Sequence, residues 1–172
     1  LWVDRRYKFT KYDTTDVKNF IKAVESWKKD YGVNNVVFPE RMTDETLQLT
    51  GEPDLIWVDA ETLVDFKTSS QVTVGHFLQV GGYSFLCKVK PLKLAILRLD
   101  KSIGLHEYIT NEDLGLSVKQ CEDAFMATLM HYRAYQMVQS TLKRGRVDDG
   151  DDTEPTDDGL GEAENIGVQP SP

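Results

Sequence analysis

Apolar side chains recur at helical spacing near the start of the chain, after residues that can cap a helix. Residues 13–16 offer side-chain oxygens that accept hydrogen bonds from the first backbone N–H groups of a helix. Apolar residues then follow three or four positions apart, at Val17, Phe20, Ile21, Val24 and Trp27. This pattern predicts an amphipathic first helix that continues until Gly32.

Short apolar runs predict strands in the next part of the chain. A β-branched and aromatic run predicts a first strand over residues 35–42, which Pro39 restricts to a sheet edge or a strand end. Apolar runs at 55–58 and 63–66 flank the polar segment 59–62. This arrangement is typical of two strands joined by a tight hairpin.

The following region returns to helical spacing. Residues 74–88 keep apolar positions three or four apart, although three glycines fall among them. An interior glycine costs a helix roughly 1 kcal/mol. We therefore expect either that another part of the chain approaches this backbone closely or that the helix is irregular. Two further strands are predicted at 93–99 and 105–109.

A capping-box pattern marks the start of a last helix. Ser117 is followed by Gln120 three positions later, and a stripe of apolar residues continues to about Lys143, with Gly145 as the stop. The predicted order is helix, three strands, helix, two strands and long helix. This order predicts an α/β fold in which a central mixed β-sheet is flanked by helices.

Acidic residues are concentrated at the C-terminal end. The formal net charge is −8, but nine of the 28 acidic residues and none of the 20 basic residues lie in 148–172. Residues 1–147 are therefore nearly neutral, which leaves a nucleic-acid partner open. We predict one domain over 1–147. We also predict a disordered acidic tail over 148–172, because that segment has too few large apolar residues to offset the entropy of ordering.

The cysteines and the overall hydropathy exclude several classes of protein. Cys87 and Cys121 each fall within an apolar segment predicted to be helical, so we interpret them as core thiols in a reducing compartment. Two cysteines cannot supply the four ligands of an iron–sulfur cluster or a structural zinc site. No run of 18 apolar residues and no signal-peptide pattern occurs. We expect a protein of the cytoplasm, or of the host-cell cytoplasm if it is viral, with no membrane partner.

Three charged residues flank the predicted hairpin. A loop symmetric about Ala60 and Glu61 would pair Asp54 with Lys67. Asp65 then points to the same face, since side chains alternate along a strand, whereas an odd-numbered loop would separate the three. Two neighbouring carboxylates repel, and Mg²⁺ or Mn²⁺ would relieve that repulsion while leaving room for water and a phosphate oxygen. Lys67 could hold the attacking water or neutralise charge on the phosphate.

An exposed ion pair between Asp54 and Lys67, worth about 0–1 kcal/mol, is the alternative interpretation. A metal site is favoured over this ion pair by the combination of two segments on predicted strands, Gly51-Glu52-Pro53-Asp54 and Asp65-Phe66-Lys67. These residues resemble the PD-(D/E)xK nuclease superfamily. More narrowly, they are similar to its RecB-like exonuclease branch, to which phage and CRISPR-associated nucleases are also similar. The resemblance implies a core like that of restriction endonucleases.

The helix after the lysine supports the narrower resemblance. Thr68-Ser69 follows Lys67, and Gln79-Val80-Gly81-Gly82-Tyr83 matches the Gln-x-x-x-Tyr pattern of that branch. Gln79 and Tyr83 are four apart and share one helical face. By resemblance they contact the metal-bound water or the nucleic-acid backbone, the alternative being an ordinary polar helix face.

The resemblance implies a metal-dependent nuclease acting on DNA, either an exonuclease or an end-processing enzyme of replication, repair or recombination. Asp54 and Asp65 would bind Mg²⁺ or Mn²⁺, and Lys67 would assist hydrolysis. An inactive nuclease-fold module that binds nucleic acid or takes part in assembly is the alternative, and a sequence-specific restriction-type endonuclease is a third, less favoured one.

Two features depart from the RecB-like pattern. Members usually carry a further His or Glu ligand in a helix before the first strand, but no histidine precedes His76. That ligand could lie upstream of Leu1, or it could be Glu25 or Glu40, of which we favour Glu40. His76 could reach the site from the start of its helix, although a packed or exposed role is the simpler expectation. The cysteines of the iron–sulfur members are also absent, so we expect a cluster-free relative.

Overall fold

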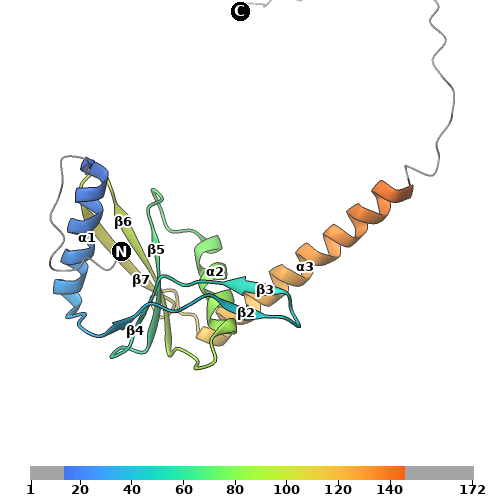
Figure 1. Ribbon diagram of the computed structural model, residues 1–172, viewed down its shortest axis with the longest axis horizontal. Helices are drawn as coiled ribbons and strands as arrows, with labels where there is room; N and C mark the ends of the chain where they lie inside the picture. Colours follow the sequence, from blue (N-terminus) through green and yellow to red (C-terminus); the bar gives the residue numbers. More distant parts are fainter. Residues whose placement is uncertain (1–13, 146–172) are drawn as a thin grey trace, which may run out of the picture. The chain divides into compact units, whose positions relative to one another are not determined.

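The structure is a computed structural model that describes residues 14–145 (Figure 1). The elements follow in chain order as α1 (Thr15–Tyr31), β1 (Val36–Val37), β2 (Met42–Asp44), β3 (Leu49–Gly51), β4 (Leu55–Trp57), β5 (Thr62–Lys67), α2 (Val74–Leu86), β6 (Lys93–Asp100), β7 (Leu105–Thr110) and α3 (Val118–Gly145).

A five-stranded mixed sheet forms the centre of the fold, with strands in the order β1-β4-β5-β6-β7. The β5–β6 pair is parallel and the other three pairs are antiparallel. The chain crosses between the two parallel strands through α2, as a parallel connection requires. The predicted α/β class, a mixed sheet flanked by helices, is confirmed.

Helices cover both faces of this sheet (Figure 1). Alternation along β5 directs Val64 into a core cluster with Trp27 of α1, and directs Leu63 into a second cluster with Val80 of α2. Each cluster also takes residues from β6. The sheet is therefore buried on both faces, which explains the nearly continuous apolar sequence of β5 and β6.

The helix ends follow the local signals in the sequence. Thr14 caps α1 by accepting a hydrogen bond from the Val17 backbone N–H at 3.4 Å, and Gly32 closes it in the left-handed conformation at φ 65°. At the start of α3, the Ser117 backbone N–H donates to Gln120 Oε1 at 2.8 Å, and the Gln120 N–H donates to Ser117 Oγ at 3.2 Å. The predicted capping box is confirmed.

The segment between α1 and β4 differs from the prediction. The strand expected over 35–42 stops at Val37, because Pro39 lacks the N–H needed to continue the ladder. Met42–Asp44 and Leu49–Gly51 then form a separate two-stranded hairpin, which the sequence did not predict.

Close packing explains two of the glycines in α2. A Cβ atom on Gly81 would lie 2.4 Å from the carbonyl oxygen of Cys121, and one on Gly82 would lie 2.7 Å from the Phe125 ring. The first turns of α3 therefore pack directly on the α2 backbone, the close approach that the sequence required. Cys87 and Cys121 are both buried and unpaired.

The chain divides into two compact units, the first ending at Arg133 and the second beginning at Ala134. Of the second unit, the structure describes the C-terminal turns of α3, where several apolar side chains are exposed: Tyr135, Met137, Val138 and Leu142. The predicted acidic tail, 148–172, lies outside the described residues. Across 14–145, none of the helices has the length and apolar character needed to cross a bilayer.

Candidate active site

The β4–β5 hairpin brings its acidic residues to one face with a register different from the one predicted. Its turn occupies residues 58–61, closed by a 3.0 Å hydrogen bond from the Glu61 N–H to the Val58 carbonyl, with Glu61 at φ 47°. Ile56 pairs with Leu63, so the predicted pairing of Ile56 with Asp65 is wrong by two residues.

A shift of two positions leaves every side chain on its predicted face, because strand side chains alternate. Continuing the observed register by one residue places Asp54 opposite Asp65, whereas the predicted partner was Lys67. Asp54, Asp65 and Lys67 still share one face of the hairpin.

A hydrogen bond fixes Asp54 against the neighbouring strand. Asp54 follows the buried Pro53 in a bend before β4, and its Oδ2 accepts from the Phe66 backbone N–H at 2.7 Å. Asp54 is exposed, whereas Asp65 is only 3% exposed. The pair therefore presents one solvent-facing and one buried carboxylate.

Burial raises the pKa of the Asp65 carboxyl, and repulsion from Asp54 adds to the rise. The adjacent Lys67 ammonium opposes this shift. Lys67 forms an ion pair with Asp65 Oδ2, and within residues 14–145 that oxygen has no hydrogen-bond partner beyond the ion pair. A second cation near Asp65 would therefore meet a carboxylate that is only partly compensated.

Two side chains of α2 extend the network from Lys67. Lys67 Nζ donates to Gln79 Oε1 at 2.8 Å, and Gln79 Nε2 donates to the Tyr83 hydroxyl at 2.6 Å. Of the six residues proposed for the site, four are directly connected by the contacts above: Asp65, Lys67, Gln79 and Tyr83. Asp54 lies on the same face of the β4–β5 hairpin. Their chemical roles stay predictions.

Gly51 has a packing role that the motif alone does not reveal. A Cβ atom at this position would lie 2.7 Å from Cδ1 of the Tyr83 ring. The bare backbone of β3 thus lets the Tyr83 ring lie against the hairpin that precedes Asp54.

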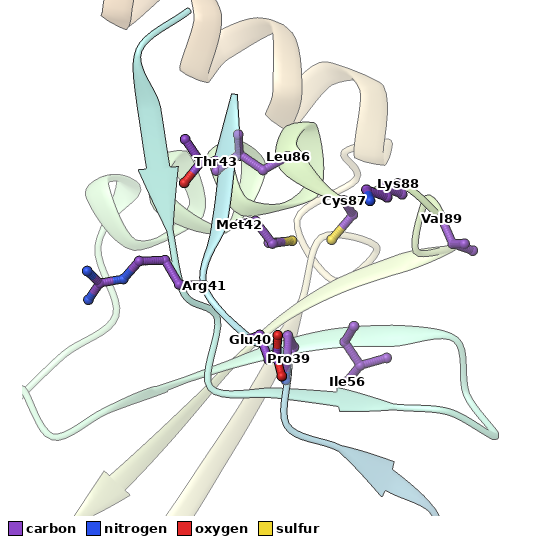
Figure 2. A pocket seen from close by; sticks show the side chains of 10 residues that line it. All are labelled: Pro39, Glu40, Arg41, Met42, Thr43, Ile56, Leu86, Cys87, Lys88 and Val89. Carbon is purple, nitrogen blue, oxygen red and sulfur yellow. The ribbon is translucent and has the colours of Figure 1, made fainter. Parts of the chain in front are cut away.

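Glu40 is the predicted site residue that the structure leaves apart. It is exposed on the segment between β1 and β2, and it lines a cavity of 440 Å³ together with Met42, Ile56 and Cys87 (Figure 2). Glu25 is ion-paired with Lys28 at 3.1 Å. Within residues 14–145, no three His, Cys, Asp or Glu side chains are grouped so as to hold a metal ion. The ligand role of Glu40 stays a prediction, without a geometric counterpart among these residues.

His76 lies at the edge of the same network. Its Nδ1 accepts from the Thr73 backbone N–H at 3.1 Å, which helps to begin α2. Partial burial lowers the pKa of His76, and the positive charge of Lys67 lowers it further. The His76 imidazole therefore caps the start of α2, and it lies close enough to Lys67 for the lysine charge to affect its pKa.

Arg98 is a neighbour of the site that the sequence motifs did not single out. It pairs with Lys67 in the parallel β5–β6 ladder. The available signal was alternation: Leu94 and Ile96 are buried toward α2, and the next residue on that face is charged. A charged residue continuing a buried face is informative because ionised side chains are seldom buried without a partner.

No family model matches the chain, and no curated protein matches it. Among solved structures, the chain is similar to a phage-related exonuclease from Haemophilus somnus 129PT, with a TM-score of 0.41 and 14% sequence identity over 76% of each chain. This likeness is too low to assign the chain to a family.

Proposed function

We propose that the protein is a Mg²⁺- or Mn²⁺-dependent nuclease that hydrolyses DNA phosphodiester bonds, of the RecB-like branch of the PD-(D/E)xK superfamily. We infer an exonuclease or end-processing role in replication, repair or recombination. One observation carries the proposal: the β4–β5 hairpin and α2 hold two carboxylates, a lysine and a glutamine together on one face of the sheet.

The donor set suits a hard divalent cation. Mg²⁺ is commonly bound by one or two carboxylates, with water and substrate phosphate completing its shell. Asp54 and Asp65 would hold the ion. The burial of Asp65 supports this, since a buried carboxylate next to a second carboxylate favours a cation. When bound, the ion would act as a Lewis acid on the phosphate.

The remaining residues would position charge. Lys67 would stabilise the negative charge that develops on the phosphate. Gln79 accepts a hydrogen bond from Lys67 and so directs its ammonium group, while Tyr83 accepts from Gln79 and fixes the orientation of the amide. Gln79 and Tyr83 therefore act as positioning residues in this proposal.

Cleavage of labelled single- and double-stranded DNA, with Mg²⁺ or Mn²⁺ and with a chelator, tests the proposal. We expect Asp65→Asn and Lys67→Met to abolish metal-dependent cleavage. Lys119 and Asp123 form an exposed ion pair on α3, so Lys119→Met and Asp123→Asn are matched controls that should keep full activity. Cleavage that survives in Asp65→Asn at an unchanged melting temperature would rule the assignment out.

An inactive nuclease-fold module that binds nucleic acid is the second candidate. It is favoured by the lack of a third clustered metal ligand within residues 14–145. Calorimetry with Mn²⁺ separates the two: binding that depends on Asp54 and Asp65 supports the enzyme, and no binding supports the module.

A further inference from the structure

The proposed reaction gives no role to the arginine beside its lysine. Arg98 on β6 pairs with Lys67 on β5, just as Leu94 pairs with Leu63, and both of these leucines lie in the core cluster under α2. Arg98 therefore extends from the face that carries Asp65 and Lys67. Neighbouring strands lie about 4.7–4.9 Å apart, so Arg98 and Lys67 extend side by side from adjacent strands.

Two carboxylates orient the Arg98 guanidinium without using all of its donors. Its Nε donates to Glu107 Oε2 at 2.6 Å, and its Nη1 lies 3.7 Å from Asp100 Oδ2. A guanidinium has five N–H donors, and Nη2 has no partner in the part of the chain that the structure describes. The side chain is 20% exposed, so it is held in place but remains accessible.

Arg98 lines a cavity of 340 Å³ that continues from the end of β5. The three residues after Lys67 line it as well, and the hydroxyls of Thr68 and Ser70 make no hydrogen bond within residues 14–145. Pockets for small ligands measure about 300–1,000 Å³, so this cavity can take about one nucleotide unit.

The charges around the cavity do not exclude an anion. Two acidic residues, Asp16 and Asp100, and two basic residues, Arg98 and Lys101, are among those that line it. Asp100 Oδ1 accepts hydrogen bonds from the backbone N–H and the hydroxyl of Ser102, at 2.9 and 2.5 Å. The turn therefore fixes the orientation of this carboxylate, whose Oδ2 lies 3.7 Å from Arg98 Nη1.

We propose that Arg98 and this cavity bind the backbone phosphate next to the phosphate that is cut. The inference rests on the proposed function, since it takes the cleaved phosphate to lie at Asp65 and Lys67. A guanidinium binds phosphate oxygens in a bidentate manner, which a lysine ammonium cannot do. Because phosphate contacts position a strand without reading its sequence, Arg98 would set the distance between the bound strand and the reacting bond.

Fluorescence anisotropy of the full chain with labelled single-stranded and blunt duplex DNA, in EDTA and over a range of salt concentrations, tests this inference. We expect Arg98→Met to weaken binding roughly tenfold, the scale of one lost hydrogen bond to a charged group. The slope of log K against log salt should fall by about 0.7 for single strands or 0.9 for duplex. Lys119→Met removes the same charge from α3 and should leave the slope unchanged.

Glu107→Gln distinguishes phosphate binding from a structural ion pair. It removes the Arg98–Glu107 ion pair but keeps Arg98, so DNA binding should become severalfold tighter. If Arg98 only supports the sheet, both variants weaken binding or neither changes it, and the inference fails. Should Arg98→Met lower the melting temperature, Arg98→Lys keeps the charge and should still lose affinity.

The DNA-binding test of Arg98 and the cleavage test of the proposed nuclease can fail independently of each other. Binding that depends on Arg98 in a protein without cleavage would contradict the nuclease and support Arg98 only as a contact for a backbone phosphate. Metal-dependent cleavage with a wild-type Kd and salt slope in Arg98→Met would overturn the contact and leave the nuclease standing. If the wild-type protein binds neither the single-stranded nor the duplex DNA, the proposed phosphate contact is also overturned. The nuclease proposal is then tested by the cleavage assay alone.

Discussion

Lys67 on β5 donates a 2.8 Å hydrogen bond to Gln79 on α2, which joins the hairpin of the candidate site to the helix that covers it. Lys67 also forms an ion pair with Asp65, so its ammonium is held from two elements. A lysine side chain has about 2 kcal/mol of rotamer entropy to lose. Gln79 therefore contributes to the site by limiting where the Lys67 charge can be.

Gln79→Leu tests this positioning role. We expect kcat for DNA cleavage to fall roughly 10- to 100-fold, the scale of a small misplacement of a catalytic group. Tyr83→Phe removes only the acceptor of the Gln79 amide, so its effect should be smaller. Steady-state kinetics with melting curves measure both, and a wild-type kcat in Gln79→Leu would contradict the role.

The affinity for Mn²⁺ should rise with pH. Burial raises the pKa of Asp65, so a proton competes with the metal ion until the pH passes that raised value. Lys67 lowers the pKa of Asp65, so Lys67→Met should move the rise in affinity to higher pH. Calorimetric titrations between about pH 5 and pH 8 measure this. A pH-independent affinity, or a shift to lower pH in Lys67→Met, would contradict the prediction.

Gly81→Ala should destabilise the fold by roughly 1–3 kcal/mol, since the new Cβ atom would lie 2.4 Å from a backbone oxygen of Cys121. Gly75→Ala is the matched control, because the nearest atom to a Cβ there is 3.6 Å away. That change should stabilise α2 by up to about 1 kcal/mol. Urea unfolding measures both, and equal effects of the two changes would contradict the packing argument.

The predictable parts of the fold are those governed by local interactions. Both ends of α1 and the start of α3 depend on short-range capping contacts, within four positions along the chain, made by Thr14, Gly32, Ser117 and Gln120. The glycines of α2 predicted a close approach, but not that α3 makes it. A partner distant in sequence leaves no local signal.

The two turns that were not predicted correctly share a backbone conformation for which the sequence gives no signal. Gln48 in the β2–β3 turn and Glu61 in the β4–β5 turn adopt positive φ angles of 49° and 47°, where Gly or Asn is usual. Without those residues, the β2–β3 hairpin went unpredicted and the β4–β5 turn was centred one residue too late. Because the resulting register error was even, the common face of Asp54, Asp65 and Lys67 survived it.

Tyr108 should make the fold sensitive to alkali. Burial raises the pKa of its hydroxyl to about 12, from 10.0 as the ordinary value. In the interval between those two values the unfolded chain loses this proton and the folded chain keeps it. The stability contribution is therefore complete below the lower value and is lost as the pH rises toward the upper one. For a partly exposed group, we expect a loss on the order of 1–2 kcal/mol.

Tyr108→Phe tests whether Tyr108 causes this alkaline loss of stability, because it removes the titrating hydroxyl and keeps the ring beside Trp27 and Tyr31. Chemical unfolding at pH 9 and at about pH 11.5 should show a smaller alkaline loss of unfolding free energy than in the wild type. Tyr31→Phe removes the hydroxyl of the exposed neighbouring ring and should leave most of the loss in place, because burial is the main cause of the raised Tyr108 pKa. Equal alkaline losses in Tyr108→Phe and the wild type would show that other groups, such as the lysines, account for the whole effect.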